Sequence, residues 1–136
     1  DHAPHLPAEK EGSCLTAASG GPMVQHTLVA MLELAARGVV TREQVVQKMA
    51  HNPADLFHID RRGYIRPGYY ADLVLVDLDT QWTVQKNNLL YKCGWSPLEG
   101  QQFHSAVVST FVNGKQVYHN GKLMAEPQGQ RITFNR

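Results

Sequence analysis

The period of the hydrophobic pattern changes near residue 58, and this change limits the fold more than any other feature of the sequence. Before it, apolar residues recur every three or four positions, as they do on the buried face of a helix. After it, short alternating segments are separated by turn signals such as Arg62-Gly63 and Pro67-Gly68. Two helices alone cannot close a hydrophobic core. The sequence therefore predicts an α/β chain, with helices followed by a small antiparallel β unit, whose helices need a further packing partner.

Two helices are predicted in the first part of the chain. The first spans residues 22–37, because its apolar positions form one stripe and Pro22 suits the first turn of a helix. The second begins after Thr41, which suits the N-cap position, with Gln44 completing a capping box. Asn52-Pro53 is expected to end this second helix, since the residue before a proline avoids helical backbone angles, and residues 53–57 are expected to start a short third turn.

The β unit is marked by short apolar segments and by two Asn-Gly turns. Asn113-Gly114 lies between two such segments and is the strongest local signal for a hairpin with a type I′ turn. Asn120-Gly121 predicts a further turn, and residues 85–104 are expected to form a long loop. The predicted strands are residues 72–78, 81–84, 106–112, 115–118 and 123–124.

Charge and composition exclude several classes of function. The 136 residues carry 13 Lys and Arg against 12 Asp and Glu, a net charge of +1, which gives no electrostatic case for a nucleic-acid partner. No apolar run reaches the roughly 18 residues of a membrane span, and the N-terminus lacks the apolar stretch of a signal peptide. The 2 cysteines are too few for a disulfide framework. We therefore expect a cytoplasmic protein with neither a nucleic-acid nor a membrane partner.

The densest cluster of chemical groups is Asp1-His2-Ala3-Pro4-His5. A carboxylate and two imidazoles are ligands that suit zinc, and Pro4 stiffens the segment. A zinc site needs three or four protein ligands, however, and a segment this short rarely supplies all of them. The residues alone leave two interpretations open: a metal or catalytic site, and a polar loop with solvated histidines.

Several strings of residues recur in the order of one known family. They are D-H-A-P-H at 1–5, S-G-G-P at 19–22, N-P-A-D-L-F at 52–57, G-Y-Y-A-D-L-V at 68–74, C-G-W-S-P-L-E-G at 93–100 and T-F-V-N-G-K-Q-V-Y at 110–118. Together they resemble the cyclic amidohydrolases, and most of all the dihydroorotases of the bacterial type. The resemblance covers nearly the whole chain, although the N-P-A and G-x-x-A-D-L-V strings are shared with hydantoinases and allantoinases.

The resemblance implies a fold. Enzymes of this family are (β/α)₈ TIM barrels with a small β-sandwich beside the barrel, and a whole barrel takes about 250 residues. The 136 residues of this chain cannot hold one. The resemblance therefore implies the C-terminal part of a metal-dependent hydrolase of this kind. Residues 1–57 would be the end of the last barrel strand and the last helices, and residues 58–136 the C-terminal share of the composite β-sandwich.

The resemblance also assigns roles to four residues. Asp1 matches an aspartate that serves as a zinc ligand and as general acid/base, taking a proton from a metal-bridging hydroxide and giving it to the leaving amide nitrogen. His5 matches a histidine that donates a hydrogen bond to the carboxylate of the substrate. Ala17 and Ala18 match a segment whose backbone contacts the dihydropyrimidine ring, although a hydantoinase-like alignment would put that contact at Ser19.

The implied function is the zinc-dependent, reversible hydrolysis of dihydroorotate to N-carbamoyl-L-aspartate in pyrimidine (UMP) biosynthesis, by a homodimeric parent with a binuclear zinc centre. The H-x-H pair, the bridging carboxylated lysine and the later histidine ligands of that centre are absent from this sequence. One carboxylate cannot hold two zinc ions, so this chain alone is expected to bind no zinc tightly and to be inactive. Two alternatives stay open: another cyclic amidohydrolase, such as an allantoinase or a dihydropyrimidinase/hydantoinase, and a non-catalytic homologue with a structural role.

Overall fold

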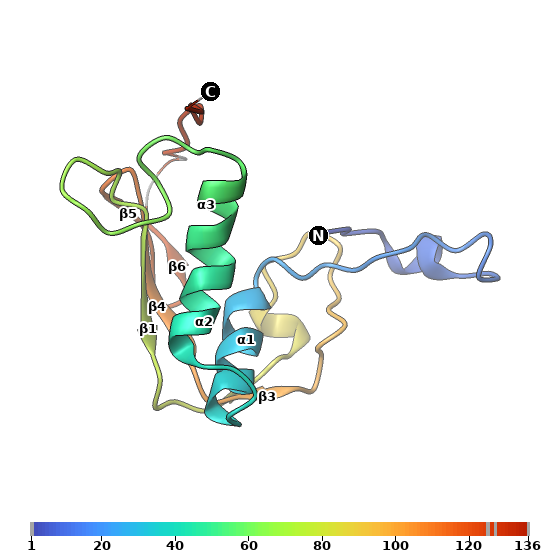
Figure 1. Cartoon of the computed structure of the whole chain (residues 1–136). Helices are drawn as coiled ribbons and strands as arrows, with labels where there is room; N and C mark the ends of the chain where they lie inside the picture. The colour runs from blue at the N-terminus through green and yellow to red at the C-terminus, as the bar shows by residue number, and fades with distance from the viewer. Residues whose placement is uncertain (1, 125, 127, 136) are drawn as a thin grey trace.

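The structure, a computed structural model, describes residues 2–124, 126 and 128–135. Its helical elements are η1 (Pro7–Lys10), α1 (Thr27–Ala36), α2 (Arg42–Val46), η2 (Gln47–His51), α3 (Asn52–Leu56) and η3 (Lys86–Asn88). Its strands are β1 (Leu73–Asp77), β2 (Trp82–Thr83), β3 (Gln102–Phe103), β4 (Ala106–Val112), β5 (Lys115–His119) and β6 (Lys122–Leu123). The main helices precede the antiparallel strands (Figure 1), as the change of period near residue 58 predicts.

Helix α1 begins at Thr27, five residues after the predicted start at Pro22, so that prediction is wrong. Residues 24–26 form a turn in which the His26 N–H donates to Met23 O at 3.0 Å. Within this turn the N–H of Gln25 donates to the hydroxyl of Tyr91, at 3.0 Å. A partner 66 residues away thus satisfies a backbone group that a regular first turn leaves open.

The segments α2, η2 and α3 form one continuous helical rod (Figure 1). The predicted cap is confirmed, because Thr41 Oγ1 accepts from Gln44 N at 3.2 Å and Gln44 Oε1 accepts from Thr41 N at 2.8 Å. The predicted end at Pro53 is wrong. The η2 segment is a π-helix in which the Asn52 N–H donates to Gln47 O, five residues back. This wider turn accommodates a proline that would otherwise clash with the carbonyl one α-turn before it.

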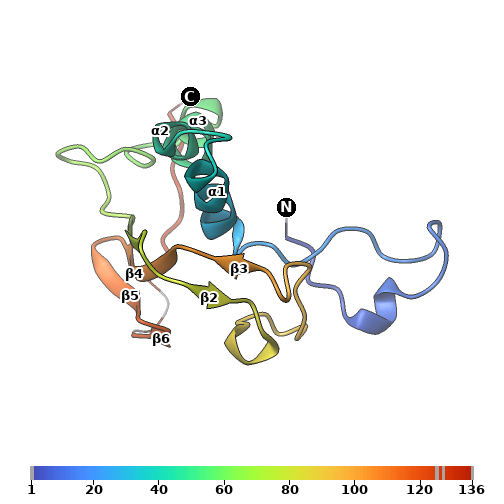
Figure 2. The same ribbon diagram turned by 90° about the horizontal axis from the view of Figure 1, so that it is seen from below.

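Four strands form an antiparallel sheet in the order β1-β4-β5-β6, and β2 pairs with β3 in a separate ribbon (Figure 2). The hairpin between β4 and β5 turns at Asn113 and Gly114, whose φ angles of 52° and 81° confirm the type I′ turn. The expected loop over 85–104 is wrong at its end, because the two residues of β3 pair with β2. A strand of this length carries too little alternation to be read from sequence.

The hydrophobic core lies between α1 and the β2–β3 ribbon. Val29 of α1 packs with Val84 and Phe103, and each of these side chains is at most 2% exposed. Trp82 and Leu98 pack against this cluster from the β unit. The helical part and the β unit therefore share one core, which lies at the first turn of α1. The division of the larger fold at residues 57 and 58 stays a prediction.

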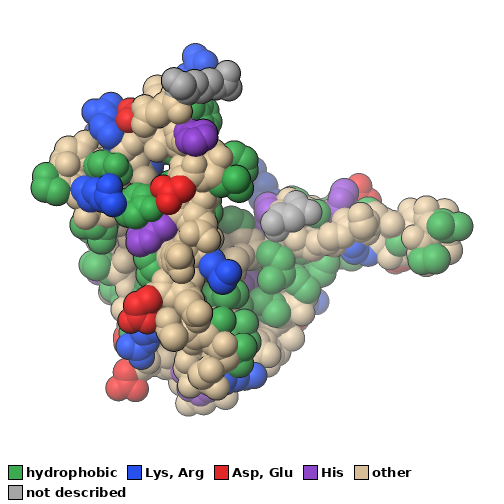
Figure 3. All heavy atoms as spheres, viewed as in Figure 1, with side chains coloured by type: hydrophobic (Ala, Val, Ile, Leu, Met, Phe, Trp, Pro, Cys, Tyr) green, Lys and Arg blue, Asp and Glu red, His purple; other side chains and the backbone are tan. Residues whose placement is uncertain are grey.

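Apolar side chains stay exposed on the rod of α2, η2 and α3 and just beyond it (Figure 3). Val46 is 51% exposed, Leu56 72% and Phe57 61%. Their exposure agrees with the expectation that the helices need a further packing partner.

Candidate functional site

The predicted site residues lie on the N-terminal segment, which runs away from the helices as an irregular arm with one short helical turn, η1 (Figure 1). Asp1 lies outside the described residues, so its assigned roles stay predictions. His5 has a side chain that is 40% exposed, with its Nδ1 atom 3.8 Å from Glu9 Oε2. Its Nε2 atom has no hydrogen-bond partner within the described part of the chain, so the structure leaves that atom available to a ligand.

The loop that carries Ala17 and Ala18 is closed by its own hydrogen bonds. The N–H of Ala17 donates to Ser13 O and that of Ala18 donates to Glu9 O, both at 2.9 Å. The N–H groups of both residues are therefore already paired within the loop, so a backbone contact from Ala17 or Ala18 to a substrate would have to use a carbonyl. Among the residues that the structure describes, none accepts from the N–H of Ser19. The alternative contact at Ser19 stays a prediction, and it is the one of the three positions whose N–H is unpaired within the described residues.

Lys10 fastens the two sides of this loop together. Its ammonium group donates to the carbonyl of Ala18 and, at 2.6 Å, to the carbonyl of Gly20. One flexible side chain therefore holds two carbonyls that flank Ser19. This contact fixes the direction in which the backbone of residues 18–20 faces.

His2 joins the N-terminal segment to the entrance of α1. Its Nδ1 atom accepts from the backbone N–H of Met23 at 3.2 Å and of Val24 at 3.5 Å. Its ring lies 5.4 Å from the ring of Tyr91, centre to centre. Because Nδ1 accepts hydrogen bonds here, the proton of the neutral imidazole lies on Nε2. His2 therefore stabilises the backbone of residues 23 and 24, just before α1.

Two further hydrogen bonds fix the backbone around His5. The indole Nε1–H of Trp95 donates to His5 O at 2.7 Å. The N–H of Ala3 donates to Gly21 O at 3.0 Å. The second bond places the segment that carries His5 beside the end of the 17–21 segment, and both are irregular.

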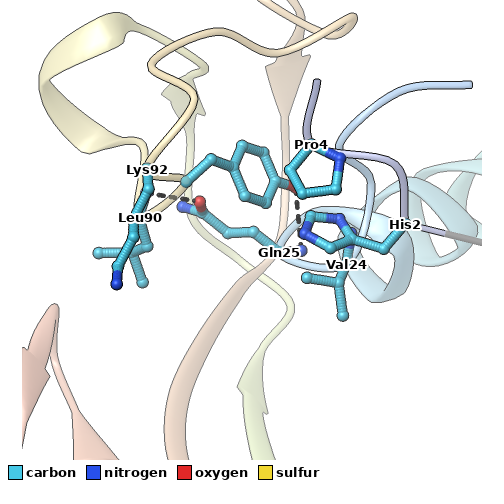
Figure 4. A pocket seen from close by; sticks show the side chains of 7 residues that line it. His2, Pro4, Val24, Gln25, Leu90 and Lys92 are labelled. Carbon is cyan, nitrogen blue, oxygen red and sulfur yellow. Dashed lines mark hydrogen bonds between the residues drawn. The ribbon is translucent and has the colours of Figure 1, made fainter. Parts of the chain in front are cut away.

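An open pocket of about 430 Å³ lies beside His2 (Figure 4). Gln25 crosses its wall, where its Oε1 accepts from Leu90 N at 2.8 Å and its backbone N–H donates to the Tyr91 hydroxyl. Burial raises the pKa of Tyr91, so its hydroxyl stays protonated at neutral pH. The lining residues are His2, Pro4, Val24, Gln25, Leu90, Tyr91 and Lys92.

Residues 1–117 of this chain match the amidohydrolase family. The chain belongs to the amidohydrolase family. The predicted membership is thereby confirmed, and the match includes both the N-terminal segment and most of the β unit.

Relatives within this family include dihydroorotases. The chain is 33% identical to the dihydroorotase of Pyrococcus furiosus over 97% of its own length, and 40% identical to that of Halobacterium salinarum over 92%. It is also 33% identical to the allantoinase of Desulfitobacterium hafniense over 97% of its length. The chain spans about a third of these curated relatives, or 31%, 29% and 30% of their respective lengths.

Solved amidohydrolase structures share the fold. The D-hydantoinase (dihydropyrimidinase) from Thermus sp. superposes with a TM-score of 0.82 over 93% of this chain and 29% of its own, at 22% sequence identity. The L-hydantoinase (dihydropyrimidinase) from Arthrobacter aurescens gives 0.75 over 82% of this chain and 25% of its own, at 28% identity. The predicted fold class, part of an amidohydrolase with helices followed by an antiparallel β unit, is confirmed.

The described residues do not form a zinc site. Among them, no three His, Cys, Asp or Glu side chains come together as metal ligands would. The Nδ1 atom of His2 is used by two backbone donors, and Nδ1 of His5 faces Glu9. No catalytic step through zinc follows from this geometry.

The structure adds residues to the candidate site that the sequence analysis missed. Tyr91 and Trp95 reach the N-terminal segment from the β unit, and Lys10 fastens its loop. Trp95 stands within the C-G-W-S-P-L-E-G string, so the resemblance contained a signal for it but assigned it no role. Nothing in the sequence marks Lys10, because its contacts form only when the loop folds back.

Proposed function

We propose that this chain is the C-terminal part of a dihydroorotase, which converts dihydroorotate reversibly to N-carbamoyl-L-aspartate. The observation that carries the proposal is its similarity to dihydroorotases, at 33–40% identity over nearly the whole chain. The chain covers about a third of those relatives, so the activity is proposed for a protein of their length, with residues 1–57 in its barrel and 58–136 in its sandwich.

His5 supports a substrate that carries a carboxylate. Its Nε2 atom is unpaired within the described residues, and its backbone is fixed by Trp95. An imidazole N–H at that position would donate a hydrogen bond to the carboxylate of dihydroorotate. A neutral hydantoin ring offers no such group, so a histidine at position 5 favours dihydroorotase over hydantoinase.

Asp1 is proposed as the catalytic residue and as a zinc ligand. A carboxylate within reach of both water and the amide nitrogen would move a proton from the attacking water to the leaving nitrogen. The other ligands of a binuclear zinc centre are not in this sequence. The backbone of residues 17–19 is proposed to contact the ring, and the pairing of the Ala17 and Ala18 amides favours Ser19 as the donor.

Another cyclic amidohydrolase is the second candidate, since an allantoinase is 33% identical and the two hydantoinases share the fold. No helix in the described part of the chain is long and apolar enough to span a membrane. The homodimeric parent, the cytoplasmic location and the absence of a nucleic-acid partner stay predictions, as does the third possibility, a non-catalytic structural homologue.

Hydrolysis assays on the complete protein that carries this sequence would test the proposal. We expect it to hydrolyse dihydroorotate in preference to allantoin and dihydrouracil, and we expect Asp1→Ala to remove nearly all turnover while the circular dichroism spectrum is kept. Asp79→Ala, which changes an exposed aspartate of the β unit, is the matched control and should keep full activity. Preference for allantoin or dihydrouracil would favour the second candidate, and full activity of Asp1→Ala would contradict the role of that residue.

A further inference from the structure

Trp95 holds the backbone of His5 from a distant part of the sequence. Its Nε1–H donates to His5 O at 2.7 Å across a sequence separation of 90 residues. The tryptophan lies in the connection between β2 and β3, so the contact joins the β unit to the N-terminal segment. A hydrogen bond this short restrains the carbonyl of His5 and with it the backbone from which the imidazole projects.

The ring of Trp95 also packs against Gly21, in the second segment of the candidate site. A Cβ atom placed on Gly21 would lie 3.6 Å from Trp95 Cη2, so the edge of the indole ring lies against this glycine. Gly21 O in turn accepts from the N–H of Ala3 at 3.0 Å. One side chain therefore contacts both segments, the one that carries His5 and the one that follows residues 17–19.

The connection that carries Trp95 is itself anchored before and after the tryptophan. Gln25 binds it through the carbonyl of Asn88 at 2.8 Å and the N–H of Leu90 at 2.8 Å. The Ser96 hydroxyl lies 3.4 Å from Nδ1 of the buried His26. The chain is thus held on both sides of Trp95 by Gln25 and His26, the two residues just before α1, which ties the backbone of His5 to this packing.

We propose that Trp95 is a positioning residue for His5, which orients the imidazole toward the carboxylate of the substrate. This inference rests on the proposed function, since it gives His5 its substrate contact. Trp95 does not touch the reacting atoms, so its effect falls on substrate binding. Loss of its N–H loosens the His5 backbone, and the imidazole must be ordered again whenever substrate binds.

The test is Trp95→Phe in the complete protein, which keeps an aromatic ring and removes the N–H donor. We expect KM for dihydroorotate to rise about 3- to 10-fold, the loss of one hydrogen bond, with kcat within about 2-fold. Trp82→Phe is the matched control, because Trp82 Nε1 also donates to a backbone carbonyl, Ser105 O, at 2.8 Å but lies in the core. This control should leave KM unchanged.

A double-mutant cycle with His5→Ala shows whether Trp95 acts through His5. In the His5→Ala background, Trp95→Phe should raise KM no further. A full additional rise in that background, or an unchanged KM in the single variant, would overturn the positioning role.

Histidine ring signals in NMR spectra separate this inference from the proposed function. Trp95→Phe should shift the His5 ring signals, whereas Trp82→Phe should not. Unchanged His5 signals would overturn the inference whatever the activity of the protein. A wild-type protein that leaves dihydroorotate intact, with His5 signals that do shift, would instead reject only the dihydroorotase assignment.

Discussion

His26 should make the stability of the fold depend on pH. The imidazole is completely buried beside Trp82 and Phe103. Its Nδ1 atom has two weak contacts, 3.3 Å to the Tyr91 hydroxyl and 3.4 Å to the Ser96 hydroxyl. Its Nε2 atom is buried with no partner in the part of the chain that the structure describes. A second N–H on this ring would therefore have no acceptor, and burial lowers the pKa of His26.

The sign of the effect follows from proton linkage. The unfolded chain takes up the His26 proton near pH 6.5, whereas the folded chain takes it up only at a lower pH. The stabilisation is therefore fully present above pH 6.5 and is lost as pH falls from 6.5 toward the folded pKa. One proton of difference makes the free energy of unfolding fall by up to about 1.4 kcal/mol per pH unit in that window.

Urea denaturation of the chain between pH 5 and 8 measures this slope. We expect His26→Phe, which keeps an aromatic ring and removes the titrating group, to lower the slope by up to about 1.4 kcal/mol per pH unit below pH 6.5. Val84→Ala is the matched control, because it truncates a fully buried residue of the same core without a titrating group. It should lower the stability at every pH and keep the wild-type slope. Equal slopes for the wild type and His26→Phe would refute the reasoning.

Two further predictions concern the loops. Gly63 and Gly68 have similar φ angles, +81° and +82°. A Cβ atom on Gly63 would clash with Ala54 and lie 2.9 Å from Ala50 O. A Cβ atom on Gly68 would meet nothing within 4 Å. Gly68→Ala should cost about 1 kcal/mol of backbone strain and Gly63→Ala about 2 kcal/mol more in urea denaturation, and equal costs would contradict the clash. Lys10→Met removes the donor to Ala18 O and Gly20 O, so amide hydrogen exchange at Ala17 and Ala18 should speed up about 5-fold. The exposed Lys86→Met is the control, and unchanged exchange in Lys10→Met would show that the loop closes without this lysine.

The elements that could be predicted are those whose determinants lie close together in sequence. Strand β4 was predicted at its observed bounds, and the Asn113-Gly114 turn was predicted by type. Both depend on neighbouring residues alone: alternation along the strand, and two residues that tolerate positive φ. The capping box at Thr41 and Gln44 is equally local and was also predicted.

The helix ends were predicted wrongly where distant contacts or an unusual turn decide them. Pro22 suits a helix start, but partners at His2 and Tyr91 satisfy the following N–H groups and delay α1 to Thr27. Pro53 usually ends a helix, but the π-turn over Gln47–His51 lets the chain continue through it. Sequence patterns report propensities, and these contacts override them.

The same division separates what was predicted of the candidate site from what was not. The role proposed for His5 comes from the family resemblance of a short string, D-H-A-P-H, and stays a prediction. The residues that set its position were missed, because they are distant in sequence. Trp95 is 90 residues away, and the segment at Gly21 lies beside it only in the folded chain. In its described residues, 2–26, the N-terminal segment has no sheet and only the short helix η1, so contacts from the β unit at Tyr91 and Trp95 supplement the hydrogen bonds within its own loop. A substitution in the β2–β3 connection should therefore affect binding at His5 more than one of equal size in β5 or β6.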